Sequence, residues 1–432
     1  MYVSNKNYIL NIKLNTWIND IEGVYDHKST SLKIINTYIN EATYIVRTND
    51  NNIKKVEQHS DIRLDLGEEL LFNVNNGKND CYRFINPIPH NLKLTEENIK
   101  YLDKKLWYVL KSDDLDTKNI NNDYYLCEND IIKLGGLKYA VQEINIQSNN
   151  FIYNEKEPPN LIPNYDISLL NKNCPPVFDF IYEVNNYYNY IDLNNIKIGI
   201  NQGDTPKSDS QKKCKICSCN ESTNGKNDPL ISLCACNELV HYKCLRKLIN
   251  EKTIIENENN FVRSIKISDF ECEKCKTQLP LRFRLSKINK IFYLIDIKKP
   301  IKCDYILLES LNLKKNDKYA KSIHIISLLK DYILIGRDIE NDVMEIESSI
   351  SRKHAVLKYN KENRNIILEN RSTKYGTLVL VKNPIQILEQ KIQLQVGRTI
   401  IETNLMKMEE FEKLKNANNI KKGSQNIKEQ KY

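Results

Sequence analysis

Eight cysteine and histidine side chains in the middle of the chain have the spacing of paired zinc ligands. The pattern runs C-x2-C, sixteen residues, C-x-C, four residues, H-x2-C, twenty-seven residues and C-x2-C. Because two ligands on one tight turn can both reach a tetrahedral ion, such pairs suit zinc. Four pairs complete two closed four-ligand sites, which indicates a structural rather than a catalytic metal. The predicted ligands are Cys214, Cys217, Cys234, Cys236, His241, Cys244, Cys272 and Cys275.

A second group of functional side chains lies nearer the C-terminal end, at three turns between apolar runs. The turns contain Gly336-Arg337, the segment from Ser351 to His354 and the segment from Ser372 to Thr377. Loops at one end of a rigid scaffold are where binding groups concentrate. A guanidinium fork with a hydroxyl and a second cation is suited to a phosphate dianion. The sequence therefore predicts a phosphate-binding site in this region.

Alternation of apolar and polar residues predicts strands on both sides of the cysteine-rich segment. Residues 1–150 contain several short runs of this kind, and one stretch, Leu94 to Leu110, could be helical. From residue 322 onward, short alternating runs separated by polar turns are typical of an antiparallel β-sandwich. Two segments, Ile132 to Gly135 and Leu394 to Gly397, share a pattern and are candidates for a diverged repeat. We predict a multidomain, mainly β protein.

Changes in composition divide the chain into five segments. A stretch rich in Asn, Tyr, Pro and Ser precedes the cysteines and is predicted to be a connector, mobile from Asn201 to Lys213. The last residues are polar and, apart from a short potential helix, are expected to be disordered. The predicted boundaries are 1–146 for a β-rich N-terminal domain, 147–213 for the connector, 214–280 for the zinc module, 288–405 for the sandwich and 406–432 for the tail.

The overall composition is typical of a soluble globular protein. Of the 432 residues 41% are hydrophobic and 28% charged, and no apolar run is long enough to cross a membrane. The start of the chain lacks the pattern of a signal peptide, so the 12 cysteines are not expected to form disulfides.

The net charge is +8, and residues 205–300 hold 19 basic against 11 acidic residues. We interpret this excess as a solvated surface, and expect an intracellular protein, cytoplasmic or nuclear, with no membrane or nucleic-acid partner.

The ligand order, together with the segments DPLISLCACNELVHYKCLRKLI and FECEKCK, resembles the RING-CH (RING-variant) zinc domain of ubiquitin ligases. The resemblance implies a cross-brace, with Cys214, Cys217, His241 and Cys244 on one zinc ion and Cys234, Cys236, Cys272 and Cys275 on the other. It also implies that the domain holds a ubiquitin-charged conjugating enzyme against a shallow apolar groove. The residues that match the family's contact positions are Ile216, Leu248, Lys276 and Pro280.

Two features depart from the RING-CH pattern. Leu248 stands where the family usually has Trp, which keeps the groove apolar but removes a large aromatic contact. Only four residues separate Cys236 from His241, a spacing that also suits the PHD finger, a histone-tail reader with the same ligand order. Phe270, two residues before the next ligand, fits the PHD pattern as well. The tight C-x-C pair and the sequence around it favour the RING-CH interpretation.

The three turns near the C-terminal end resemble those of the forkhead-associated (FHA) domain, a phosphothreonine-binding module. The residues implied to contact phosphothreonine are Arg337, Ser351, Arg352 and Lys374. Those implied to be structural are Gly336, His354, Gly376 and Thr377, with the histidine bracing the binding loops. Tyr375 replaces the family's usual Asn, which removes an amide that commonly grips the peptide backbone. Residues 129–141 resemble the family's closing strands, so a degenerate FHA-like sandwich is one hypothesis for the N-terminal domain.

Taken together, these resemblances predict a phosphorylation-directed E3 ubiquitin ligase. The FHA domain would select threonine-phosphorylated proteins, while a zinc domain with two Zn²⁺ would bring the ubiquitin-conjugating enzyme. Joining both in one chain raises the effective concentration of the charged enzyme near its substrate. No residue of this chain is expected to be a nucleophile, since RING ligases act by positioning. The alternative is a non-catalytic phosphoprotein scaffold or chromatin reader with a PHD-like finger.

Overall fold

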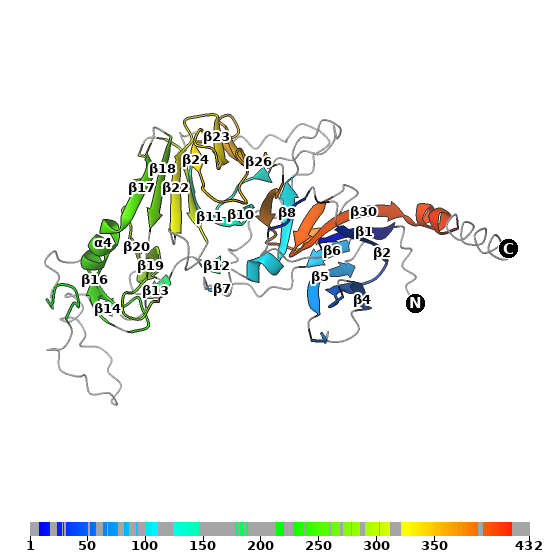
Figure 1. Ribbon diagram of the computed structural model, residues 1–432, viewed down its shortest axis with the longest axis horizontal. Helices are drawn as coiled ribbons and strands as arrows, with labels where there is room; N and C mark the ends of the chain where they lie inside the picture. Colours follow the sequence, from blue (N-terminus) through cyan, green and yellow to red (C-terminus); the bar gives the residue numbers. More distant parts are fainter. Residues whose placement is uncertain are drawn as a thin grey trace, which may run out of the picture. The chain divides into compact units, whose positions relative to one another are not determined.

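The computed structural model describes residues 8–17, 24–27, 29, 32–50, 52–57, 64–66, 68–76, 82–85, 92–93, 101–110, 124–146, 178–179, 182–184, 187–188, 213–219, 228–236, 238–258, 261–267, 271–277, 279–285, 290–301, 303–311, 321–372, 374–387 and 392–416. These residues are mainly β-strands, as the sequence predicts (Figure 1). The described helices include α4 (Tyr242–Glu251), the 3-10 turn η1 (Leu102–Lys104) and residues 408–416. The chain forms two compact units, which comprise Met1–His90, Thr95–Val177 and Lys330–Tyr432 for unit 1, and Asn91–Leu94 and Phe178–Leu329 for unit 2.

Eight strands of unit 1 lie side by side in one sheet. They are β1 (Tyr8–Trp17), β2 (Leu32–Ile39), β8 (Leu106–Leu110), β10 (Ile131–Leu134), β11 (Leu137–Asn145), β27 (Thr377–Leu380), β29 (Gln393–Val396) and β30 (Thr399–Lys407). Their order across the sheet is β11, β10, β27, β8, β29, β30, β1, β2. Strands from the first third of the chain therefore alternate with strands from its last quarter.

Two five-stranded sheets complete unit 1. Their strands are β3 (Thr43–Arg47), β4 (Ile53–Glu57), β5 (Glu69–Asn76), β6 (Tyr82–Ile85), β9 (Tyr124–Tyr125), β23 (Tyr332–Gly336), β24 (Val343–Met344), β25 (Ala355–Asn360), β26 (Asn365–Asn370) and β28 (Ile385–Gln386). One sheet has the order β24, β23, β25, β26, β9, and the other has the order β28, β6, β5, β3, β4. Each sheet thus takes four strands from one end of the chain and one short edge strand from the other.

Each end of the chain contributes strands that pair with strands from the other end, and this exchange within one chain is made by two similar hairpins. The β10–β11 hairpin turns at Gly135-Gly136 and pairs with β27, while the β29–β30 hairpin turns at Gly397-Arg398 and pairs with β1. Gly135 and Gly397 have φ values of +58° and +48°, a region that glycine adopts without strain in two-residue hairpin turns. The two segments that share a sequence pattern are therefore the same local structure. Because of this exchange, the predicted ranges 1–146 and 288–405 do not delimit two separate compact units.

One further prediction for unit 1 needs correction, and another agrees with the structure. Leu106–Leu110, within the stretch predicted as a possible helix, forms β8 and is buried along its whole length between β27 and β29. A continuous apolar run is compatible with either a buried strand or a helix, and here the neighbouring strands decide. The short potential helix of the predicted tail forms over residues 408–416, and the Phe411 ring packs 4.8 Å from the ring of Tyr38. Residues 417–432 lie outside the described part of the chain.

Unit 2 contains the cysteine-rich segment and several small sheets. Its strands are β7 (Leu92–Lys93), β12 (Phe178–Asp179), β13 (Tyr182–Val184), β14 (Tyr187–Tyr188), β15 (Leu230–Ile231), β16 (Val240–His241), β17 (Thr253–Glu258), β18 (Val262–Ile267), β19 (Arg282–Leu285), β20 (Lys290–Tyr293), β21 (Tyr305–Ser310) and β22 (Lys321–Ser327). The strands β20, β21 and β22 fall within the predicted sandwich range but belong to unit 2. Apart from β12, β13, β14 and Lys213, the predicted connector lies outside the described residues.

One apolar core holds α4 against the strands of unit 2. Leu245 and Ile249, four residues apart on one face of the helix, are buried in a cluster with Ile265 and Ile267 of β18 and with Phe283 of β19. The helix begins directly after His241, so the core also fixes the position of the ligands around its first turn. Among the described residues, no helix has the length and apolar character needed to span a membrane.

Candidate metal centres and phosphate-binding loops

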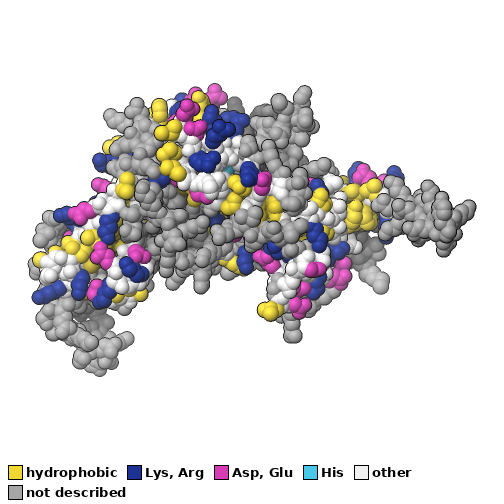
Figure 2. Space-filling model, viewed as in Figure 1, with side chains coloured by type: hydrophobic (Ala, Val, Ile, Leu, Met, Phe, Trp, Pro, Cys, Tyr) yellow, Lys and Arg dark blue, Asp and Glu magenta, His cyan; other side chains and the backbone are white. Residues whose placement is uncertain are grey.

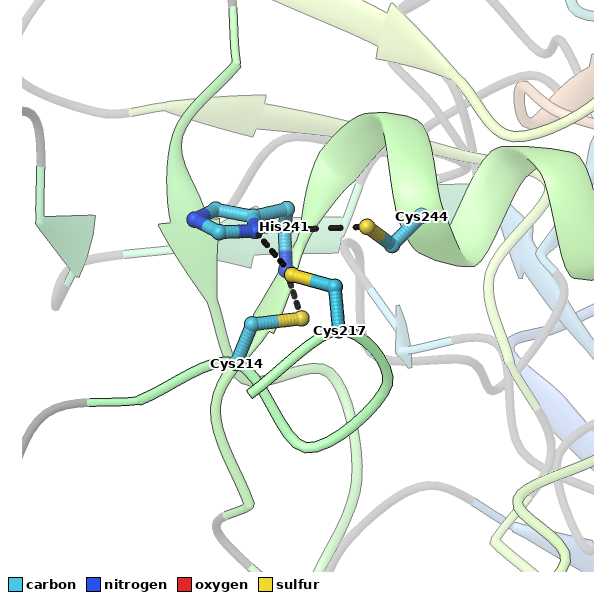
Figure 3. A group of neighbouring side chains, drawn as sticks. All are labelled: Cys214, Cys217, His241 and Cys244. Atoms are coloured by element: carbon cyan, nitrogen blue, oxygen red, sulfur yellow. Dashed lines mark hydrogen bonds between the residues drawn. The ribbon is translucent and has the colours of Figure 1, made fainter. Parts of the chain in front are cut away.

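The first group of predicted ligands comes together at the start of α4. Cys214 and Cys217 lie on one turn, His241 ends β16 and Cys244 lies in the first turn of the helix (Figure 3). The Sγ atoms of Cys217 and Cys244 lie 3.3 and 3.9 Å from His241 Nδ1. The backbone N–H of His241 donates to Cys214 Sγ at 3.3 Å. The four side chains therefore surround one point.

The second group consists of four cysteines from two separate turns of unit 2. Cys234 Sγ lies 3.0 Å from Cys236 Sγ, which lies 3.8 Å from Cys272 Sγ. Cys275 completes the group, and its Sγ lies 3.2 Å from the Thr277 hydroxyl. In each of the two groups, all ligand atoms lie within 4.8 Å of one another. The structure thus assembles two groups, each of which could hold a metal ion.

The donor atoms and their spacing fit zinc. A tetrahedral ion with Zn–S bonds of about 2.3 Å holds two sulfurs about 3.8 Å apart, and a sulfur about 3.5 Å from an imidazole nitrogen. The observed separations of 3.0 and 3.8 Å between sulfurs, and of 3.3 and 3.9 Å between sulfur and nitrogen, lie around these values. One group offers three sulfurs and one nitrogen and the other four sulfurs, which are ligand sets of structural zinc sites.

The acid–base properties of the thiols couple metal binding to proton release. Burial, together with neighbouring thiols, raises the pKa of Cys234 above its ordinary value and that of Cys244 to about 12. Hydrogen bonds from the side chain and backbone of Thr277 lower the pKa of Cys275 to about 5. Because the thiolate is the form that binds metal, Cys234 and Cys244 lose their protons only when a cation is bound.

A groove of about 370 Å³ lies beside the two ligand groups. Its lining includes the apolar side chains of Ile216, Leu233, Val240, Leu245, Leu248 and Leu279. The charged residues along it are of both signs and include Lys215, Glu238, Lys252, Glu271, Glu273 and Lys274. Ile216 comes from the turn that carries Cys214 and Cys217, and Leu248 comes from α4. The structure therefore brings together two of the four residues predicted to contact a conjugating enzyme.

The other two predicted contacts are not among the described residues that line this groove. Lys276 is exposed, has a φ of +56° and forms an ion pair with Glu271 at 3.0 Å. Pro280 is half-buried and follows Leu279, which does line the groove. Both residues therefore lie near the second ligand group without forming the groove.

Backbone contacts hold two of the predicted phosphate-binding loops together. The Arg337 N–H donates to the carbonyl oxygen of Ser351 at 3.0 Å. Gly336 is required beside it, because an added Cβ would lie 2.2 Å from the Arg352 carbonyl oxygen. The Asn341 side-chain amide donates to that same carbonyl at 2.7 Å. The backbone positions of Arg337 and Ser351 are therefore fixed relative to each other.

His354 connects the second loop to the third. Its Nδ1 accepts the Ser351 N–H at 3.0 Å, and its Nε2 lies 3.0 Å from the Gly376 carbonyl oxygen. A carbonyl can only accept, so the ring is neutral with its proton on Nε2. The side chain is fully buried, and this burial lowers the pKa of His354 to about 4. His354 therefore braces two loops from behind rather than facing a ligand.

Ser372 organises the third loop. Its hydroxyl lies 3.1 Å from the Ser351 hydroxyl and accepts backbone N–H bonds of 3.2–3.4 Å from Lys374, Tyr375 and Gly376. Gly376 has a φ of +69°, which favours glycine. The Thr377 hydroxyl donates to the Asn370 side chain at 2.9 Å. Ser351 is thereby held between the second and third loops.

The basic side chains of the loops are exposed on this buried frame. Arg337, Arg352 and Lys374 are exposed and Ser351 is half-buried, whereas Gly336, His354, Gly376 and Thr377 are buried. Basic side chains lie among acidic, hydrophobic and uncharged ones on the surface over β23 and β24 (Figure 2). The Lys374 ammonium lies 5.0 Å from the Tyr375 ring centroid. Exposed cations on a rigid frame can bind a phosphate ester without reorganising the loops.

A comparison with models of protein families identifies the domain to which these loops belong. The model of the FHA domain matches residues 333–401. These residues are an FHA domain. FHA domains bind phosphothreonine-containing proteins, and the match includes all four residues predicted to contact phosphothreonine. Comparisons with curated proteins and with solved structures give no match.

The FHA match does not include every residue that supports its loops. The strands β8, β9 and β10, which pair with β27 and β26, precede the match by some two hundred residues. The Gly136 N–H donates to the Ser349 hydroxyl at 2.7 Å, which braces the second loop. Asn341 and Ser372 both lie within the match. Of the two, only Ser372 belongs to one of the three turns that the sequence predicts to bind phosphate. Nothing in the sequence pattern points to Asp26 or His27, which contact the third loop.

Proposed function

We propose that this chain is a phosphorylation-directed ubiquitin ligase. In this proposal the FHA domain binds a threonine-phosphorylated protein through Arg337, Ser351, Arg352 and Lys374. The cysteine-rich module, loaded with two zinc ions, holds a ubiquitin-charged conjugating enzyme. The observation that carries the ligase function is the apolar groove lined by both Ile216 and Leu248.

The metal ions have a structural role in this proposal, because they would fix both walls of the groove. Ile216 lies between two ligands of the first group, and Leu248 follows Cys244 on the same helix. Cys234 and Cys272 of the second group also line the groove. Removing either ion would release ligands that support the groove, so metal content and enzyme binding are expected to fall together.

The chain itself supplies no nucleophile to this reaction. The zinc ligand sets are complete, so neither ion has a free position at which to activate water or substrate. Transfer would depend on positioning, with the thioester of the conjugating enzyme held near a substrate bound by the FHA domain. Lys276, exposed next to the last ligand, is the residue proposed to help orient the bound thioester.

Ubiquitin transfer with a panel of conjugating enzymes tests the ligase function, with Ile216→Ala as the informative variant. Ile216 is 44% exposed, so its truncation should leave the fold intact while removing apolar surface from the groove. Ile254→Ala is a matched control, because Ile254 is also 44% exposed and does not line the groove. We expect Ile216→Ala to lose transfer activity at unchanged zinc content, and Ile254→Ala to retain activity.

Two outcomes would contradict the ligase proposal. Equal ubiquitin-transfer activity of Ile216→Ala and Ile254→Ala would show that the groove does not contribute to transfer. Inactivity of the unmodified, zinc-loaded chain with every enzyme tried would instead favour a non-catalytic phosphoprotein scaffold or chromatin reader. The presence of Leu248, rather than a large aromatic residue, is the feature that supports this alternative.

A further inference from the structure

The connection between β1 and β2 reaches the third phosphate-binding loop from the opposite end of the chain. The Asp26 carboxylate lies 3.6 Å from the Lys374 ammonium. The adjacent His27 N–H donates to the Lys374 carbonyl oxygen at 2.8 Å. The His27 ring lies so close to Gly376 that an added Cβ would be 2.7 Å from its Cε1. An acidic residue is therefore held directly beside a proposed phosphate contact.

Buried contacts fix the position of Asp26. The indole N–H of Trp17 donates to the Asp26 carbonyl oxygen at 3.0 Å. The rings of Tyr25 and His27 stack on Trp17, with centroid distances of 4.9 and 5.8 Å. His27 Nε2 also lies 3.0 Å from the Gln395 side-chain oxygen. The proximity of Asp26 to Lys374 is therefore built into the fold and does not depend on two mobile side chains meeting.

We propose that Asp26 is a specificity-determining residue of the FHA site, a resident carboxylate that competes with the ligand phosphate for Lys374. The proposal rests on the phosphothreonine-binding function proposed above. The side chains of Lys374 and Asp26 are 51% and 35% exposed, and ion pairs this exposed are weak. A phosphate dianion can therefore displace the carboxylate from the ammonium group.

The fixed backbone keeps Asp26 near the phosphate even after displacement, so the two like charges repel each other. The site consequently binds phosphothreonine less tightly than its cations alone would allow. A basic residue of the ligand next to the phosphothreonine would offset this repulsion, and an acidic residue would add to it. The preferred partner is thus a phosphothreonine segment with basic rather than acidic neighbours.

Titration of the full chain with a phosphothreonine peptide and its unphosphorylated twin tests this role. We expect Asp26→Asn to bind the phosphopeptide about two- to fivefold more tightly, because an exposed charge of this kind has a modest effect. The gain should disappear when Lys374→Met is introduced as well, which ties it to this ion pair. Preference for a phosphopeptide with lysine, over one with glutamate, beside the phosphothreonine should decrease in Asp26→Asn.

Asp331→Asn is the matched control. Asp331 also forms a solvent-exposed ion pair, at 2.8 Å from Lys361, but it precedes β23 whereas Arg337 follows that strand. The six residue steps from Asp331 to Arg337 span about 20 Å of extended strand, and at physiological salt charges interact over only about 8 Å. Asp331→Asn should therefore leave the affinity unchanged. Asp26→Ser, a second variant of the same position, should tighten binding as Asp26→Asn does.

The outcomes separate this inference from the function on which it rests. If the unmodified chain binds both peptides equally, the phosphothreonine function fails, and the role of Asp26 fails with it. If the unmodified chain prefers the phosphopeptide but both Asp26 variants bind it with equal or lower affinity, only the role of Asp26 is overturned. A similar gain in Asp331→Asn would also overturn it, since the effect would then reflect net charge alone.

Discussion

Acidification should destabilise the FHA domain in part through His354, a buried neutral histidine. Its neutral ring accepts the Ser351 N–H and lies beside the Gly376 carbonyl oxygen, so a second proton would break the first of these bonds. Burial lowers the pKa of His354 to about 4, whereas an unfolded histidine titrates near pH 6.5. Between these values the unfolded state binds the additional proton and the folded state does not. Stability is therefore highest above about pH 6.5 and falls as the pH decreases towards 4.

The size of the effect follows from the difference between the two pKa values. Each pKa unit corresponds to about 1.4 kcal/mol, and integration from pH 7.5 to pH 4.5 gives a loss of about 2–3 kcal/mol in the free energy of unfolding. This is a large part of the stability of an ordinary domain. His354→Gln provides the comparison, because glutamine can also donate and accept hydrogen bonds but does not titrate.

Urea unfolding followed by tryptophan fluorescence measures this effect in the intact chain. The two tryptophans, Trp17 and Trp107, are both buried in unit 1, so the signal is not sensitive to unfolding of the zinc module. The stability difference between the unmodified chain and His354→Gln should shrink by about 2–3 kcal/mol between pH 7.5 and 4.5. Other groups, including His27, whose pKa burial also lowers, are common to both proteins and cancel. A difference that stays constant with pH would refute the assignment of the neutral ring.

Two further predictions concern the phosphate and metal sites. Arg337→Ala should weaken phosphothreonine-peptide binding by roughly tenfold to a hundredfold and Ser351→Ala by less, since a bidentate charged contact contributes about 2–3 kcal/mol against about 1 for a hydroxyl. Lys361→Ala, at the far end of β25, should change nothing, and equal losses for Arg337→Ala and Lys361→Ala would contradict the proposed contact. Cys234→Ser should retain at most one zinc ion by metal analysis, whereas Cys219→Ser, at an exposed thiol outside both groups, should retain two. Full zinc content in Cys234→Ser would exclude the second site.

The two metal groups could be predicted from the sequence because ligand spacing is local information. The pairs Cys214/Cys217 and Cys272/Cys275 each lie on a single turn, and two atoms on one turn already define half of a tetrahedral site. Which pairs share an ion was implied by family resemblance, and the structure forms the same two groups. The turn from Ser351 to His354 was recognisable for a similar reason, since the Ser351 N–H donates to His354 Nδ1 within the turn, while its other hydrogen bonds reach neighbouring segments.

The strand exchange and the role of Asp26 could not be predicted in the same way. Alternating apolar and polar residues indicate a strand and its buried face, but they do not identify its partner. β10 pairs with β27, although more than two hundred residues separate the two strands in sequence. β8 lies between β27 and β29, whereas the strand that follows it in sequence, β9, pairs with β26 in another sheet. Asp26 belongs to a connection with no motif, and only the fold brings it to Lys374.

This exchange changes what the FHA match means for experiments. Residues 333–401 contain every proposed phosphate contact, yet β27, which begins one residue after Gly376, is buried between β8 and β10 from the first third of the chain. A fragment covering 288–405 would lose both neighbours of β27 and leave its four buried residues without partners. Loss of phosphopeptide binding in such a fragment would therefore reflect the missing strands. The contacts of Lys374 can be tested only in the full chain, where β1 and the residues after it are present.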